Sequence, residues 1–599
     1  MKRKRVSLYI GISIIASLLA MMVVSLFYTP YPVTEMNRDE RFAPPSANHP
    51  LGTDNFGRDV LSRIMKGSQT AFFVGLIAVS VGGLFGVLVG AIAGYFGGML
   101  DEFIMRLMDA MMAFPGILFA LMFVSIFGVG IRNTIIAIGI MSIPSFARIT
   151  RSGFIQHKEF EYVKNARVKG VSNFRIMFSH ILPNVLSPII VAASMGFSSA
   201  VLSEAALSYL VLGVQLPDPS WGRMLNESQV FITLSPWYTS AGDLHNADSS
   251  RLQLPGRRYR RSPGQAAVGV NVERIISDRA LLQVRDLNIS FTTAKGDFPA
   301  VRGISFDVGR NSIVGLVGES GCGKSVTALA IMRLLPGNAR LSGTIDFSGR
   351  NIVAMHEEEI RKLRGSEISM IFQEPLTSLN PLWKVGRQID ENLKMHTELK
   401  GDDRFQSVVD IMRDVGLPDP ERLYHKYPHE LSGGMRQRIA IAIAVACRPA
   451  LIIADEPTTA LDVTIQAQIL QLLKDINREK GSSIIFISHN FGIIREICTS
   501  ICVMYAGHLV EIAPTEKLFC EPRHPYTIGL MKAIPKTDSK GKELYDIPGK
   551  VPSITDTLPG CPFEPRCEYA FERCKRELPQ FEVLGEQHES RCFLAGELR

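Results

Sequence analysis

The sequence predicts an all-α membrane region followed by an α/β domain with a phosphate loop and a cysteine-rich C-terminal extension. All long apolar runs lie before about residue 213, and none after about residue 280 is long enough to span a bilayer. From residue 281, short β-branched runs alternate with segments of helical periodicity. All nine cysteines lie at or after Cys322, which argues against a secreted disulfide scaffold and favours a reducing compartment for the second half.

The 599 residues are too many for a single core, and the formal net charge is +7. A positive charge can indicate nucleic-acid binding, but cytoplasmic loops of membrane proteins also accumulate basic residues, and the apolar runs favour this second interpretation.

The first predicted span is the uncharged run at 6–27, which follows MKRKR. It is long for the core of a signal peptide and no small-x-small cleavage site follows it, so we expect a retained anchor with a cytoplasmic N-terminus. Further spans are predicted at 70–96, about 110–129, 133–150 and 185–212.

The loop between the last two predicted spans is basic, and both this charge and the count of crossings predict that it is cytoplasmic. Its basic residues are Arg148, Arg151, Lys158, Lys164, Arg167, Lys169 and Arg175.

Two polar features accompany the apolar segments. Glu204 falls inside the fifth span, where an unpaired carboxylate costs several kcal/mol; it is either a functional group or a glutamate packed against another helix near a span end. Arg106 and Asp109 are expected to form a structural ion pair at the mouth of the third span.

The second half contains apolar, β-branched segments that we predict to be strands, most of them followed by a helix. This alternation predicts an α/β domain with buried strands. The segments are 281–291, 312–318, 367–373, 450–457 and 482–489.

The segment GLVGESGCGKSVTALAIM has the G-x-x-x-x-G-K-S spacing of a phosphate loop between a strand and a helix. Its glycines let backbone N–H groups surround phosphates at a helix N-terminus, while Lys324 reaches the β- and γ-phosphates and the Ser325 hydroxyl binds Mg²⁺. The predicted nucleotide-binding residues of this loop are Gly318, Glu319, Ser320, Gly321, Cys322, Gly323, Lys324, Ser325 and Val326.

Polar residues end three of the predicted strands: Gln373, the adjacent Asp455 and Glu456, and His489. Each can be a solvated or structural residue, but the carboxyl ends of strands in α/β sheets form ligand sites, and as a set they predict a γ-phosphate sensor. We predict that Asp455, with Ser325 and Gln373, holds Mg²⁺, and that Glu456 is the general base for the attacking water.

The segment LSGGMRQR (431–438) opens a helix with a backbone anion nest, and with it the second half resembles the nucleotide-binding domain of an ABC transporter. The phosphate loop, Gln373, this signature, Asp455–Glu456, TALD with Asp462, and His489 follow in the family's order. The resemblance implies that two such domains enclose two ATP molecules and that Ser432, Gly433 and Gly434 act on the opposite phosphate loop. It also implies an adenine-stacking aromatic residue, which best matches Phe291, with Phe298 as the competing position.

The segments 372–389 and 524–535 resemble the ATPases of oligopeptide and dipeptide importers. Four cysteines follow, Cys561, Cys567, Cys574 and Cys592, spaced C-x5-C-x6-C-x17-C. From chemistry alone, clustered cytosolic thiols can bind Zn²⁺ or an iron–sulfur cluster or stay free, and the C-x2-C of common zinc sites is missing. The resemblance implies a [4Fe–4S] cluster.

The first half resembles the permease subunit of the same importer class at 49–64, 105–120 and 219–225. The loop at 161–184 resembles the permease coupling motif, with Ala166, Gly170, Leu182 and Pro183 in place and Lys164 and Asn165 replacing the usual Glu-Ala. We expect a short helix, broken at Gly170, in a groove of the ATPase; the alternative is a basic, solvated loop.

The membrane topology poses a problem at the junction of the two halves. The coupling loop and the ATPase must lie on one side, yet only one span, 185–212, separates them, and the sixth span expected after PWYT (236–239) is missing because charged residues interrupt 240–266. Three explanations remain: an out-of-frame segment at 240–275 that fuses two adjacent genes, a genuine linker after a non-standard return, or a displaced fifth span.

We therefore expect a permease domain (1–239), an atypical Arg/Pro-rich junction (240–279), an ABC ATP-binding domain (280–534) and the C-terminal extension (535–599). The predicted function is ATP-driven import of peptides or a similar small solute across the cytoplasmic membrane. ATP and Mg²⁺ are the expected ligands, and the partners are a second permease, a second ATPase and an extracytoplasmic solute-binding protein, without nucleic acid. The alternatives are a damaged fusion that hydrolyses ATP without transport and a nickel importer subunit.

Overall fold

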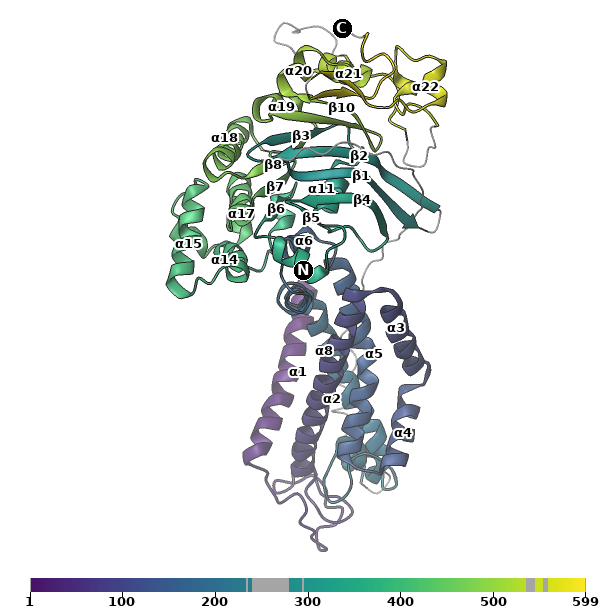
Figure 1. Ribbon diagram of the computed structural model, residues 1–599. Helices are drawn as coiled ribbons and strands as arrows, with labels where there is room; N and C mark the ends of the chain where they lie inside the picture. The colour runs from purple at the N-terminus through teal and green to yellow at the C-terminus, as the bar shows by residue number, and fades with distance from the viewer. Residues whose placement is uncertain are drawn as a thin grey trace. The chain divides into compact units, whose positions relative to one another are not determined.

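A computed structural model describes residues 2–232, 235–239, 280–293, 296–459, 461–534, 545–552, 559–585 and 587–597. The chain divides into two compact units (Figure 1). The first holds the residues up to Lys158 together with those from Met177 to the junction, and the second holds Glu159–Ile176 and the residues after the junction. The predicted junction, 240–279, lies outside the described residues.

The first unit is helical, as predicted. Among its described residues, the helices Val60–Phe96 and Ile131–His157 and the stretch Asn173–Tyr209 are long and apolar enough to cross a membrane, and one bent helix pair could make a fourth span. Its elements are α1 (Lys2–Phe27), α2 (Val60–Phe96), α3 (Gly98–Ala113), α4 (Gly116–Phe127), α5 (Ile131–His157), η1 (Ile176–Ile181), α8 (Leu182–Tyr209), α9 (Trp221–Gln229) and η2 (Pro236–Thr239). The intervening helices α6 (Glu161–Val168) and α7 (Asn173–Arg175) belong to the second unit.

The third apolar segment is not the single span predicted at 110–129. Helices α3 and α4 meet at an angle of 87°, so this part is a bent pair. The cause is Pro115, which has no N–H to donate and pushes the residue before it out of the helical region; Phe114 is accordingly extended, with φ −83° and ψ 131°.

Helices α2 and α5 pack closely through glycines one turn apart. A Cβ at Gly82, Gly86 or Gly90 would come within 2.5 Å of an atom of α5, so only glycine allows this approach. The contacts run in register from Gly82–Ser142 to Gly90–Ala147, which makes the two helices parallel. Helix α8 is antiparallel to α2, since its Gly196 lies beside Val79 and its Val201 lies beside Gly75.

A buried ionic network closes the end of this unit at the start of α2. Arg58 Nε lies 2.7 Å from Asp54 Oδ2, and Arg63 pairs with Asp54 and with Glu227 Oε2 at 3.1 Å. Tyr238 is buried and donates to Glu227 Oε2 at 3.1 Å. The PWYT segment is therefore fixed at the end of this unit where α2 begins.

Two sequence predictions about polar residues of this unit are resolved by their contacts. Glu204 is buried and accepts a 2.6 Å hydrogen bond from Ser208 Oγ one turn further along α8, so the carboxylate is packed and satisfied. The predicted Arg106–Asp109 pair is wrong: Arg106 bonds Glu102 at 3.2 Å, and Asp109 bonds Arg148 of α5. Arg106 pairs with a residue one turn earlier on its own helix, and Asp109 pairs with a residue on a second helix, so the two do not pair with each other.

The second unit contains an eight-stranded sheet in the order β11-β12-β10-β9-β3-β8-β7-β6 and a four-stranded sheet in the order β2-β1-β4-β5. The strands β9, β3, β8, β7 and β6 run parallel, and all five predicted strand segments are confirmed. The strands are β1 (Ala280–Thr293), β2 (Gly296–Gly309), β3 (Ile313–Val317), β4 (Ala339–Phe347), β5 (Arg350–Asn351), β6 (Ile368–Ile371), β7 (Leu451–Asp455), β8 (Ser483–Ser488), β9 (Ser500–Tyr505), β10 (His508–Pro514), β11 (Glu582–Gly585) and β12 (His588–Ser590).

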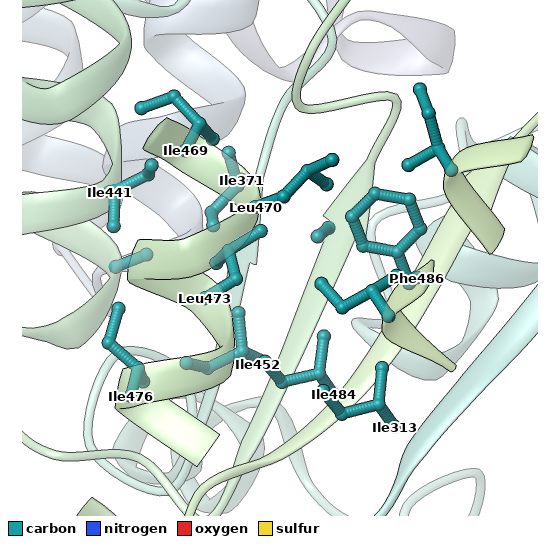
Figure 2. Packing of buried hydrophobic residues seen from close by; sticks show 14 of the residues in the cluster. Ile313, Ile371, Ile441, Ile452, Ile469, Leu470, Leu473, Ile476, Ile484 and Phe486 are labelled. Carbon is teal, nitrogen blue, oxygen red and sulfur yellow. The ribbon is translucent and has the colours of Figure 1, made fainter. Parts of the chain in front are cut away.

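Alternate residues of the parallel strands face two separate cores. On one face, Ile452, Ile484 and Phe486 pack against Leu470 and Leu473 of α18 (Figure 2). On the other face, the intervening residues pack against α11 and the four-stranded sheet. Because both faces are covered, the strands are apolar throughout, which is why the sequence predicted them.

Figure 1 shows the helices of this unit beside the main sheet and between the two sheets. They are α11 (Lys324–Ile331), α12 (Glu357–Leu363), α13 (Pro375–Ser378), α14 (Val385–His396), α15 (Gly401–Asp414), α16 (Pro420–Tyr424), η3 (Pro428–Glu430), α17 (Gly433–Val445), α18 (Val463–Lys480), α19 (Phe491–Ile497), α20 (Thr515–Cys520), α21 (Pro525–Ala533), η5 (Glu564–Arg566) and α22 (Glu572–Arg576).

The C-terminal extension adds two strands to the main sheet. Strand β12 pairs antiparallel with β10 at Glu511–Ser590 and Ile512–Glu589, and β11 pairs with β12. The extension is thus part of the same sheet as the phosphate-loop strand β3.

Candidate nucleotide and coupling sites

The predicted phosphate loop joins β3 to α11. Gly318, Gly321 and Gly323 have φ of +151°, +85° and +105°, values that side chains rarely adopt, so the loop needs glycine there. A Cβ at Gly318 would also lie 2.1 Å from the carbonyl oxygen of Met504. Lys324 Nζ donates to the carbonyl oxygens of Gly318 at 2.8 Å and Glu319 at 3.0 Å, which holds the ammonium against the loop.

Ser325, at the start of α11, faces the end of β7. Its hydroxyl donates to Asp455 Oδ1 at 3.1 Å, so the structure brings together two of the predicted Mg²⁺ ligands. Burial, reinforced by the neighbouring charge of Glu456, raises the pKa of Asp455 to about 6, while the bond from Ser325 and the charge of Lys324 act in the opposite direction. Hydroxyl and carboxylate oxygens suit Mg²⁺.

Glu456 is the meeting point of the other predicted catalytic residues. Gln373 Nε2 donates to Glu456 Oε2 at 2.9 Å, and His489 Nδ1 lies 3.1 Å from Glu456 Oε1. Thr459 Oγ1 donates to Oε2 at 3.0 Å. Glu456 itself has φ +48°, a strained conformation for a residue with a side chain, which these contacts help to maintain.

The signature segment lies at the start of α17. The Ser432 hydroxyl caps this helix by accepting from the Met435 N–H at 3.4 Å, and both Ser432 and Gly433 are exposed. Asp462 caps α18 in the same way, through the Ile465 N–H at 3.0 Å. Gly434 packs beside Ile465, so the two caps are neighbours.

Phe291 and Phe298, the two candidates for the adenine-stacking residue, are direct cross-strand partners on β1 and β2. Both are half-buried, and the geometry keeps them at one end of the four-stranded sheet.

The segment α6–α7 belongs to the second unit and packs against α13, which follows Gln373. Asn165 Nδ2 donates to the Ser378 carbonyl at 2.8 Å, and Thr377 Oγ1 donates to Glu161 Oε2 at 2.6 Å. The expected short helix is present, and it ends before Gly170, whose φ is +74°. A Cβ at Gly170 would lie 2.4 Å from the Arg361 carbonyl oxygen, so the segment occupies a tight groove and is not a solvated loop.

A buried ion pair fixes this segment on α14. Lys169 Nζ lies 2.6 Å from Glu391 Oε2, with the two side chains only 5% and 1% exposed, and Arg175 Nε lies 3.3 Å from the other oxygen of Glu391. His396 Nε2 contacts the Lys169 carbonyl at 2.8 Å.

The four C-terminal cysteines, Cys561, Cys567, Cys574 and Cys592, line one pocket with Phe563 and Phe593. Burial raises the pKa of Cys561 to about 12 and that of Cys592 to about 11. All four thiols are free of disulfides. Among the described residues, no group of three or more His, Cys, Asp or Glu side chains lies close enough to hold a metal ion. The donor set suits a cluster, but its present spacing does not support the predicted [4Fe–4S] centre.

Several contacts of these sites were missed by sequence reasoning. Thr459 lies three residues after Glu456, a spacing that could have indicated its role. The bonds of Thr377 and Glu391 to the α6–α7 segment join residues more than 200 positions apart, and no local signal predicts them.

Comparison with known families agrees with both halves. Residues 86–241 match the binding-protein-dependent transport system inner membrane component, residues 301–459 match the ABC transporter family, and residues 510–574 match the C-terminal region of oligopeptide/dipeptide transporters.

Two curated relatives cover the second half. The oligopeptide transport ATP-binding protein OppD of Salmonella typhimurium is 46% identical over 313 residues, which are 52% of this chain and 93% of that protein. The probable peptide ABC transporter ATP-binding protein y4tR of Sinorhizobium fredii is 45% identical over 53% of this chain and 96% of that protein.

Fold and site together define an ATP-binding cassette, with a phosphate loop and a carboxylate centre for ATP and Mg²⁺, joined to a helical permease region of an inner membrane protein. Within that class, the chain belongs to the oligopeptide/dipeptide family of ABC transporters and carries permease and ATPase regions in one polypeptide.

Proposed function

We propose that this chain imports peptides across the cytoplasmic membrane by coupling ATP hydrolysis to movements of its permease region. The observation that carries this proposal is the continuity from Glu456 through Gln373 to α13 and then to α6, in which each step is a hydrogen bond or a few residues of chain. Both relatives are named as peptide transport proteins, which points to peptides as the solute.

In the hydrolytic step, Glu456 accepts a proton as the water oxygen attacks the γ-phosphorus and the bond to the ADP oxygen breaks. Gln373 and Thr459 orient the Glu456 carboxylate, and His489 contacts its other oxygen. Ser325, Asp455 and Gln373 would hold Mg²⁺, which neutralises charge on the phosphate oxygens when bound.

Nucleotide binding uses the loop Gly318–Val326, whose N–H groups and Lys324 receive the phosphates. In this proposal Lys324 exchanges its bonds to the Gly318 and Glu319 carbonyls for the phosphates. Phe291 stacks on adenine, and Asp462 borders the site.

The signature residues, the exposed Ser432 and Gly433 and the half-buried Gly434, would bind the γ-phosphate held by a second ATPase subunit. We propose a complex with that subunit, a second permease subunit and an extracytoplasmic solute-binding protein. The four-domain division at residues 239, 279 and 534 belongs to the same proposal.

We propose a multi-pass topology with the ATPase unit in the cytoplasm. The contacts of α6–α7 within the ATPase unit support this topology. The segment follows Lys158 in the basic loop that is predicted to be cytoplasmic, so the ATPase unit is expected on the same side. Protease treatment of right-side-out and inverted vesicles tests this topology, with cleavage followed at 240–279 and within the ATPase unit. The proposal is contradicted if the protease reaches both regions only from the extracytoplasmic side.

We also propose that Cys561, Cys567, Cys574 and Cys592 bind a [4Fe–4S] cluster: the four thiols line one pocket, and binding would draw them closer together than they lie in the described structure. Iron and sulfide analysis of anaerobically purified protein, with visible absorbance, tests this; a preparation that contains zinc or no metal contradicts it.

The function is tested by ATPase measurements on the full chain in nanodiscs with its partner subunits. We expect peptide-loaded binding protein to stimulate hydrolysis, and a Glu456→Gln variant to bind ATP without turnover. The peptide assignment would be overturned if only a nickel-loaded binding protein stimulated hydrolysis. A rate of hydrolysis that no loaded binding protein changes would favour a non-transporting fusion.

A further inference from the structure

The phosphate loop is bound directly by the C-terminal extension. Arg566 Nη1 lies 2.8 Å from Glu319 Oε2, and Nη2 lies 3.2 Å from Glu319 Oε1, which makes a two-bond pair between a guanidinium and a carboxylate. The Arg566 side chain is 4% exposed and that of Glu319 is 28% exposed. Pairs of this geometry are among the stronger charge-assisted contacts in proteins.

Arg566 is itself fixed by the surrounding backbone. Its Nε donates to the Pro548 carbonyl at 2.9 Å, and Nη2 donates to the Ile547 carbonyl at 3.1 Å. Its Nη1 also lies 3.3 Å from the Tyr505 hydroxyl, and the guanidinium carbon is 5.8 Å from the centre of that ring. A guanidinium held at each nitrogen has little freedom, so it presents a fixed position to Glu319.

Glu319 is held from a second direction and contacts Lys324 of the phosphate loop. Its backbone N–H donates to the buried Tyr526 hydroxyl at 3.0 Å. Its carbonyl accepts from Lys324 Nζ at 3.0 Å. The position of Glu319 therefore sets both the path of the phosphate loop and the resting place of the lysine.

Arg566 lies between the first two cysteines of the extension, in the turn η5 (Glu564–Arg566). The Cys567 N–H donates to the Glu564 carbonyl at 3.1 Å, and the Cys561 N–H donates to the Cys574 carbonyl at 2.7 Å. The turn that carries Arg566 is thus part of the wall of the four-cysteine pocket.

We propose that Arg566 is a positioning residue for ATP binding: it fixes Glu319 so that the phosphate loop keeps its binding shape, and it neutralises a carboxylate that otherwise repels the phosphates. Through this contact the C-terminal extension sets the affinity of the ATPase for nucleotide. The inference rests on the proposed function only in that ATP binds at the phosphate loop.

The test is the dissociation constant of Mg-ATP for the full chain in detergent, measured by displacement of a fluorescent trinitrophenyl-ATP. We expect Arg566→Ala to weaken binding by about tenfold, which is the range for loss of a charge-assisted pair, and Arg566→Lys by a smaller factor because one ammonium cannot make both bonds. Arg576→Ala, in the same extension but on an exposed pair with Glu572, should bind like the wild type.

If Arg566 acts only on folding, its replacement should weaken ATP binding equally with Glu319 present and with Glu319 replaced. If Arg566 acts through Glu319, Arg566→Ala should change the dissociation constant less than about threefold in a Glu319→Gln background. Equal effects in both backgrounds, or wild-type affinity of Arg566→Ala, would overturn the inference. If Arg566→Ala does not fold, Arg566→Lys and Glu319→Gln carry the same comparison. A wild-type chain that binds no ATP contradicts the proposed function instead.

Discussion

Removing the Glu391 carboxylate should undock the coupling segment from the ATPase. In Glu391→Ala, Lys169 loses its 2.6 Å partner while its side chain stays 5% exposed, and Arg175 loses its own contact. Breaking a buried pair by removing one partner costs about 3–5 kcal/mol. Since about 1.4 kcal/mol is a factor of ten, the ratio of docked to undocked segment should fall by about 10²- to 4 × 10³-fold.

Hydrogen–deuterium exchange of the full chain measures this directly at the amides of α6 (Glu161–Val168). We expect exchange there to accelerate by about the same factor in Glu391→Ala, and transport per ATP hydrolysed to fall. The double variant Lys169→Met with Glu391→Leu should restore much of the protection, because an apolar pair of similar volume can replace a buried ion pair.

Asp414→Ala is the matched control, since Asp414 pairs with Lys480 in the same unit but is 55% exposed. An exposed pair contributes about 0–1 kcal/mol, so exchange in α6 should not change. Unchanged exchange and unchanged coupling in Glu391→Ala would refute the reasoning.

The remaining predictions concern three further residues. Glu456→Gln should lower turnover at least about 10²-fold while Mg-ATP binding persists, because the amide cannot accept the proton; comparable hydrolysis by the variant refutes the assignment. Gly170→Ala should reduce transport per ATP, because its Cβ would lie 2.4 Å from the Arg361 carbonyl, whereas Gly401→Ala, which has positive φ but open space around it, should not. Burial lowers the pKa of His508 to about 3 in the folded chain. As pH drops below about 6.5, the unfolded chain therefore takes up a proton at His508 that the folded chain does not. The free energy of unfolding should then fall by up to about 1.4 kcal/mol per pH unit. Thermal unfolding at pH 5 and pH 7 should show a smaller difference for His508→Leu than for the wild type, and equal differences contradict this.

The strands of the ATPase unit could be predicted from sequence because both faces of the parallel sheet are covered. Ile452 and Ile453 face different cores, yet both positions require apolar residues. The phosphate loop was predictable for a similar local reason, since its glycines and Lys324 lie within a few residues of one another.

Features that depend on distant residues were not predictable. The segment around Pro115 was predicted as one straight span because both flanking segments are apolar. Hydropathy gives no information about the angle between two apolar helices. Arg106 pairs with a residue of its own helix, and Asp109 pairs with a residue of α5. These partners follow from how the helices pack and not from their spacing in the sequence. The contact of Arg566 with Glu319 joins residues 247 positions apart, and the extension's strands pair with β10 through a register that no local pattern indicates.

The most direct test of the central claim is peptide accumulation in proteoliposomes that contain the chain with its partner permease and ATPase, with ATP in the lumen and labelled peptide on the binding protein outside. We predict ATP-dependent accumulation by the wild type and none by Glu456→Gln. Hydrolysis of ATP by the wild-type assembly without accumulation of peptide would contradict the account.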